Sequence, residues 1–131
     1  MLATVCWGIW GFALKKAIQH MPPLAAYIVF GSMGIILVPV YATMARRWNI
    51  PLKFPPIGSA WIVLAAIAVG IGTVSLLYAM REREASTVVA LTGAYPIVTL
   101  GLSVLLLGEA LTVSKMGGVA AIGLGVYLLT R

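Results

Sequence analysis

Residues 86–109 read STVVALTGAYPIVTLGLSVLLLGE, and no charged side chain occurs in this stretch before its last residue, Glu109. A helix needs about 20 predominantly apolar residues to cross the hydrocarbon core of a bilayer, because each residue adds about 1.5 Å to its length. The stretch meets that requirement. It therefore predicts a membrane-spanning helix, and the fold depends on how many such helices the chain contains.

The whole chain is also rich in hydrophobic residues and poor in charged ones. Of its 131 residues, 62% are hydrophobic and only 9% are charged, whereas about 25% of the residues in soluble domains are charged. A soluble protein of this size could not remove so much apolar surface from water. The composition indicates an integral membrane protein whose surroundings are membrane lipids.

Four further apolar runs carry no charge or a single lysine: residues 1–14, 21–45, 54–80 and 110–130. We therefore expect an all-α integral membrane protein with one transmembrane domain over residues 1–131. Its five helices are predicted at about 2–20, 24–45, 58–80, 86–107 and 111–130.

The basic residues lie mainly between the apolar runs. Lys and Arg total 9 against 3 acidic residues, which gives a net charge of +6. Basic residues in such places meet anionic lipid head groups, so we expect no binding to nucleic acid. Five spans put the termini on opposite sides of the membrane, with four basic residues on one side and five on the other. The positive-inside rule then gives no bias, and insertion in both orientations is permitted.

The chain lacks the side chains from which an active site is usually built. It has one His, one Cys and three Glu, with no Asp, and no Glu falls within a predicted span. No Ser-His-acid triad and no His/Cys metal site can be assembled from this set. We expect neither enzymatic activity nor a bound cofactor or metal.

Polar side chains recur along the fourth predicted span. They follow spacings of 3, 4 and 4 residues, which places them on one helix face; they are Thr92, Tyr95, Thr99 and Ser103. Pro96 lies on the same face and removes the backbone hydrogen bond to the carbonyl of Thr92. Two interpretations stay open: the face lines a path for a solute, or its hydroxyls only hold helices together.

Two adjacent lysines stand near the end of the first predicted span. On a helical projection Lys15 shares a small and polar face with Gly11, whereas Lys16 lies on a more apolar side. A charged group inside a membrane costs at least ~2.5 kcal/mol and points to a functional site, but lysines near helix ends are also common anchors. Lys15 is therefore either an anchor or a binding site for anionic or carboxylate groups, and Lys16 is expected to be an anchor.

Small residues recur every four positions in the fifth predicted span, at Gly117, Ala121 and Gly125. This pattern lets two helix backbones approach closely. It predicts either packing within the subunit or a contact between two subunits. Glycines in the third predicted span, Gly70 and Gly72, are also interpreted as sites of close packing.

Gly108 and Glu109 stand at the turn between the last two predicted spans. Glycine suits the left-handed conformation that ends many helices. A glutamate just before the next helix is stabilised by the positive end of that helix. The simplest interpretation of Glu109 is therefore structural.

Residues 96–129, PIVTLGLSVLLLGEALTVSKMGGVAAIGLGVYLL, resemble the C-terminal part of an EamA-type domain. In that family a helix with a proline runs into Leu-Gly-Glu and then into a glycine-rich last helix. The matching residues here are Pro96 and Leu107-Gly108-Glu109. Residues 7–17, WGIWGFALKKA, likewise resemble the first helix of the family.

The resemblance implies a member of the drug/metabolite transporter superfamily. Such proteins usually carry two five-helix halves of inverted topology, and this chain corresponds to one half of such an inverted-repeat transporter. The implied function is transport of small organic solutes, such as amino acids or other metabolites, by alternating access. A homodimer of two antiparallel subunits, in a bacterial or archaeal cytoplasmic membrane, would supply both halves of such a transporter.

A second hypothesis is a non-transporting membrane subunit or scaffold that packs beside another membrane protein. The polar face of the fourth span and Lys15 favour transport, because a scaffold needs neither. The related small multidrug resistance proteins use a glutamate in their first helix for proton exchange, and the first span here has no acid. Coupling by that route is therefore not expected.

Overall fold

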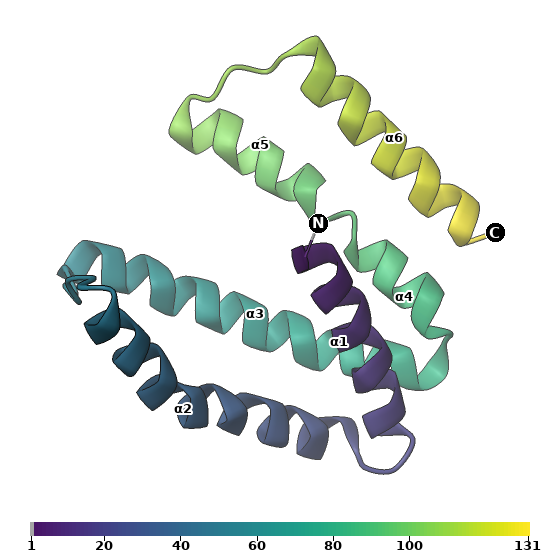
Figure 1. The fold of residues 1–131 in the computed structure, drawn as a ribbon. Helices are drawn as coiled ribbons and strands as arrows, with labels where there is room; N and C mark the ends of the chain where they lie inside the picture. The colour runs from purple at the N-terminus through teal and green to yellow at the C-terminus, as the bar shows by residue number, and fades with distance from the viewer. Residues whose placement is uncertain (1) are drawn as a thin grey trace. The chain divides into compact units, whose positions relative to one another are not determined.

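The computed structural model describes residues 2–131, which form helices joined by short connections (Figure 1). The six helices are α1 (Leu2–Ile18), α2 (Pro23–Arg47), α3 (Pro56–Glu82), α4 (Ala85–Thr92), α5 (Tyr95–Leu107) and α6 (Val113–Leu129). Residues 2–131 contain no β-strand. The predicted all-α class is confirmed, and the ends of the first three predicted helices are right to within two residues.

The predicted helix over residues 86–107 corresponds to one apolar segment, Ala85–Leu107, which the structure divides into α4 and α5. The helix is interrupted after Thr92, and α5 starts at Tyr95. Pro96 has no N–H to donate to the Thr92 carbonyl, so the regular ladder of hydrogen bonds fails there. Around the interruption the backbone tightens: Ala94 N–H donates to Leu91 at 3.1 Å, three residues back, and Ile97 N–H donates to Ala94 at 3.0 Å. Such three-residue bonds belong to a 3₁₀ turn.

Three segments of the described chain are long and apolar enough to cross a membrane: Pro23–Arg47, Pro56–Glu82 and Ala85–Leu107. Only 6%, 17% and 6% of the residues in their most apolar stretches are buried within the protein. Apolar side chains left outside the protein interior need an apolar solvent, and lipid supplies it. The helices α1 and α6 have only 17 residues each and are not among these three segments. Their lengths therefore do not confirm the predicted count of five spans.

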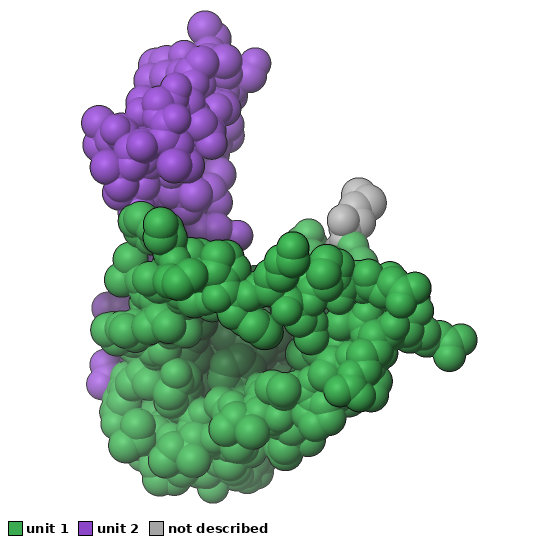
Figure 2. All heavy atoms as spheres, turned by 90° about the vertical axis from the view of Figure 1, so that its left-hand side faces the viewer, with its two compact units in different colours: residues 1–81 green, residues 82–131 purple. Residues whose placement is uncertain are grey.

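The chain divides into two units, residues 1–81 and residues 82–131, which Figure 2 shows in different colours. In the first unit, α2 and α3 are joined by residues 48–55 and run in opposite directions (Figure 1). Most buried side chains of this unit come from the end of α1, the start of α2 and the end of α3, with Ala45 near the end of α2, and Leu77 and Met80 of α3 are 0% exposed. This small core fixes the C-terminal end of α3.

A glycine allows a close contact between α2 and α3. A Cβ atom built on Gly70 of α3 would lie 2.7 Å from the phenol oxygen of Tyr27 on α2, which is too close for any real side chain. A Cβ on Gly72 would meet no atom within 4 Å. The predicted close packing is therefore confirmed at Gly70, and Gly72 faces open space.

In the second unit, α6 lies beside α4. The half-buried residues of α6 define the face that it turns to the protein; they are Lys115, Val119, Ile122, Gly125 and Val126. Gly117 and Ala121 are exposed. A Cβ on Gly117 would meet no atom of residues 82–131 within 4 Å. The small residues at the start and centre of α6 thus do not pack against this unit.

Candidate functional site

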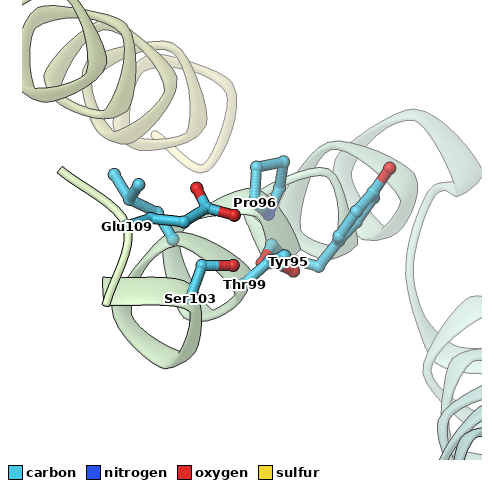
Figure 3. A pocket seen from close by; sticks show the side chains of 6 residues that line it. Tyr95, Pro96, Thr99, Ser103 and Glu109 are labelled. Carbon is cyan, nitrogen blue, oxygen red and sulfur yellow. The ribbon is translucent and has the colours of Figure 1, made fainter. Parts of the chain in front are cut away.

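A pocket of about 440 Å³ lies along one face of α5. It is lined by residues at the spacing of successive helical turns, together with one residue of the connection to α6; they are Tyr95, Pro96, Thr99, Leu100, Ser103 and Glu109 (Figure 3). Because α5 is a regular helix from Tyr95 to Leu107, residues four positions apart stack on one face. The pocket is therefore made by the same face that the sequence pattern singles out.

Glu109 reaches this pocket because the chain turns back at the end of α5. Gly108 has φ 66° and ψ 23°, which is the left-handed conformation, and glycine adopts it without steric cost. The N–H group of Glu109 donates to the carbonyl of Ser103 at 3.2 Å, which closes the turn. This turn places the Glu109 side chain beside the polar face of α5 rather than beyond its end.

A single ion pair links the pocket to α6. The ammonium of Lys115 lies 3.0 Å from Glu109 Oε2, and the two side chains are 39% and 47% exposed. Thr112 precedes α6, and its hydroxyl accepts a hydrogen bond from the backbone N–H of Lys115 at 3.3 Å. The side chain of Thr112, not that of Glu109, therefore caps α6. Glu109 contacts the first turn of this helix through the Lys115 side chain.

The orientation of the side chains divides the pocket into two ends. Figure 3 shows the Glu109 carboxylate and the Ser103 hydroxyl on the same side of α5, both turned toward Pro96, whereas the Tyr95 phenol points away from Glu109. The Thr99 hydroxyl donates to the Tyr95 carbonyl at 3.2 Å. Glu109 is the only charged residue among the six that line the pocket.

The structure brings together four of the predicted path residues, Tyr95, Pro96, Thr99 and Ser103, and leaves Thr92 out. Thr92 belongs to α4, on the other side of the interruption, and its hydroxyl donates to the Val89 carbonyl at 2.8 Å. A continuous helix would have kept Thr92 on the same face. Because the helix is broken, the predicted stripe of four polar residues is shortened to three within α5.

Gly11 and Lys15 lie in α1, in the first unit. Gly11 is buried, and Lys15 is partly buried whereas Lys16 is exposed, so the two lysines have different surroundings. The Lys15 ammonium donates a hydrogen bond to the backbone carbonyl of Met80 in α3. Lys15 therefore has at least one structural partner.

Two pocket residues, Leu100 and Glu109, were not predicted as part of a path. Leu100 is four residues after Pro96 and shares its face, which helical spacing alone could have indicated. Glu109 was interpreted as structural because it follows the end of the helix. Gly108 indicates a left-handed cap at this point, but the direction of the chain after the cap follows from the folded geometry and not from the sequence pattern.

The long apolar helices and the polar pocket beside one of them define a multi-pass α-helical membrane protein. The sequence profile of the EamA-like transporter family matches residues 1–131. The chain belongs to the EamA-like transporter family.

Two curated relatives extend this comparison. An uncharacterized protein of Methanocaldococcus jannaschii is 33% identical over 130 residues, which cover 99% of this chain and 92% of that protein. Protein PecM of Dickeya dadantii is 32% identical over 128 residues, which cover 92% of this chain and 39% of PecM. No solved structure shows a significant match to the chain.

Proposed function

We propose that this protein transports small organic solutes across the membrane, and that the solute contacts the pocket on α5. One observation carries the proposal: in a chain of a transporter family, the predicted path residues Tyr95, Thr99 and Ser103 line a single pocket. Polar groups are costly in an apolar environment unless they have partners, and a solute on this face would provide them. Amino acids and related metabolites are the expected solute class.

We further propose a single domain of five spans, with α4 and α5 forming one broken span. Residues 85–107 number 23, and α1 and α6, at 17 residues, are at the lower limit of about 17–25 residues for a spanning helix. Broken helices are tolerated in membranes where they line a cavity. The interruption beside the α5 pocket supports this assignment.

An antiparallel homodimer would supply the second half of an alternating-access transporter. The segment aligned to PecM covers 39% of that protein, so PecM is more than twice as long as the aligned segment. Two inverted copies of a five-span unit place a solute site at the interface between them. The near-equal division of basic residues supports insertion in both orientations, in a bacterial or archaeal cytoplasmic membrane.

Uptake into proteoliposomes tests the transport proposal. The purified protein is reconstituted and screened with radiolabelled amino acids, amines and carboxylates. The double variant Thr99→Val/Ser103→Ala should lose most uptake. Ser75→Ala is the matched control, because the Ser75 hydroxyl donates to the Ile71 carbonyl of its own helix at 2.9 Å and lies outside the pocket.

Two results would contradict the proposal. Uptake that survives the double variant would remove the α5 pocket from the solute path. The alternative of a non-transporting subunit or scaffold would be supported if no solute moved and another membrane protein co-purified in equal amount.

A further inference from the structure

We infer that Glu109 is the site in the α5 pocket that binds the ammonium group of a solute, and that Lys115 occupies this site until the solute displaces it. The inference rests on the proposed transport function and specifies the solute class: molecules with a primary amine. It differs from the sequence-based interpretation, which gave Glu109 a structural role and placed binding of anionic groups at Lys15.

Three side chains of the pocket, Glu109, Thr99 and Ser103, offer acceptors for hydrogen bonds. Glu109 offers two carboxylate oxygens and no donor in its ionised form. The Thr99 hydroxyl has already donated its hydrogen to the Tyr95 carbonyl, so its oxygen is left to accept. The Ser103 hydroxyl also lines the pocket and can accept a hydrogen bond. An ammonium group carries three donors and no acceptor, so it complements this set.

Lys115 shows that the carboxylate can receive an ammonium. Its Nζ atom lies 3.0 Å from Glu109 Oε2, a normal distance for a charge-assisted hydrogen bond. A primary amine on a solute would present the same group with the same geometry. The protein's own lysine is thus a model for the proposed ligand.

The ion pair is also weak enough to exchange. With side chains 39% and 47% exposed, a lysine–glutamate pair contributes little to stability. The left-handed turn at Gly108 holds the backbone of Glu109, whose N–H donates to the Ser103 carbonyl at 3.2 Å, so the carboxylate stays beside the pocket when Lys115 leaves. A fixed acceptor and a replaceable cation are the requirements for competition by a solute amine.

Charge-matched probes test the inference on the full-length protein in detergent. Phenethylamine and hydrocinnamate share a phenylethyl skeleton, and alaninamide and N-acetylalanine share an alanine skeleton. Within each pair one probe carries an ammonium and the other a carboxylate. We expect the wild type to bind both amines about ten-fold more tightly than their carboxylate partners, since a hydrogen bond to a charged group is worth about that factor or more.

Three variants then separate a binding role from a structural one. Glu109→Gln should weaken amine binding about ten-fold. Lys115→Gln should strengthen it, because the internal competitor is gone. Glu84→Gln, which changes a glutamate outside the pocket, should leave it unchanged.

The charge swap Glu109→Lys/Lys115→Glu is the decisive variant. It keeps an ion pair between the two positions, so thermal stability should be retained. It also puts a lysine at the pocket position, so the preference should move from amines to carboxylates. A purely structural ion pair would give wild-type probe binding in the swapped protein.

The inference is overturned if Glu109→Gln binds both amines as the wild type does, if the swap leaves the preference unchanged, or if neither amine binds the wild type. Failure of this kind is distinguishable from failure of the proposed function. If other solutes are still taken up and uptake depends on Thr99 and Ser103, transport through the α5 pocket stands without a role for Glu109.

Discussion

The ammonium of Lys15 in α1 donates a hydrogen bond to the backbone carbonyl of Met80, two residues before the end of α3. The last carbonyls of a helix have no partner within the helix, and this end carries a partial negative charge. Lys15 supplies both a donor and a positive charge there. The bond joins α1 to α3 beside the fully buried side chains of Leu77 and Met80.

We expect Lys15→Met to destabilise the protein by about 1.5 kcal/mol, because it removes a charge-assisted hydrogen bond while keeping much of the side-chain length. Lys16→Met is the matched control. Lys16 is the exposed neighbour, and its removal should change stability by less than about 0.5 kcal/mol. Unfolding in detergent followed by circular dichroism measures both.

The same pair of variants tests whether Lys15 also acts on the solute, which stays a prediction. If it does, uptake by Lys15→Met should fall under conditions where the folded fraction is unchanged. Equal and small effects on uptake from both variants would leave Lys15 with its role at the end of α3 alone.

Gly108→Ala should destabilise the protein by about 1–2 kcal/mol, because alanine pays a steric cost in the left-handed conformation that Gly108 adopts at φ 66°. Gly101→Ala is the control. Gly101 lies within α5 and a Cβ there would meet no atom within 4 Å, so alanine should be neutral or stabilising. Thermal unfolding of the two variants should therefore shift in opposite directions. Equal shifts would contradict the turn that places Glu109.

Gly70→Ala should be less stable than Gly72→Ala by about 1 kcal/mol, since the added methyl group at Gly70 meets the phenol oxygen of Tyr27. Both substitutions gain the same helix propensity, which cancels in the comparison. Tyr27→Phe removes the oxygen in question. In the Gly70→Ala background it should recover most of the lost stability, and a double-mutant cycle measures this. Additive effects would show that α2 and α3 do not meet at this point.

Cysteine cross-linking tests the arrangement of the proposed dimer. The small residues of α6 are centred on Ala121, the middle residue of the helix Val113–Leu129. If two copies of α6 pack antiparallel, Ala121→Cys should cross-link with itself, and Gly117→Cys should cross-link with Gly125→Cys when the two variants are mixed. All three variants also carry Cys6→Ser, because Cys6 is exposed.

A parallel dimer would give the opposite result. Gly117→Cys would then cross-link with itself rather than with Gly125→Cys. Absence of any cross-link through α6 would leave the small residues with no contact between subunits. Reporters of sidedness fused after Arg131 give an independent check: an antiparallel dimer requires the C-terminus on both sides of the membrane.

The sequence could predict the helices because apolar runs and their length are local properties. The same is true of the polar face of α5, since the spacing of Tyr95, Thr99 and Ser103 fixes their common side once the segment is helical. The sequence also indicated that Pro96 removes a hydrogen bond. It could not show that the helix would break there, because a proline within a helix produces either a kink or an end, depending on the surrounding packing.

Contacts between residues distant in sequence were not predictable from periodicity. The bond from Lys15 to Met80 depends on how α1 meets the end of α3, which a pattern within α1 does not contain. The place of Glu109 depends on one backbone conformation at Gly108. The predicted cap explained why glycine stands there, but the direction of the chain after the cap follows only from the folded geometry.

The interruption between α4 and α5 has an electrostatic consequence for the α5 pocket. Because α5 begins at Tyr95, the partial positive charge of a helix start lies at one end of the row of pocket residues, and the Glu109 carboxylate lies at the other. In an unbroken helix the positive end would lie at residue 85, the start of α4. The break also places the partial negative charge at the end of α4, at Thr92, next to this positive end, so the two partial charges oppose each other. The carboxylate of Glu109 is therefore the dominant charge among the six residues that line the pocket.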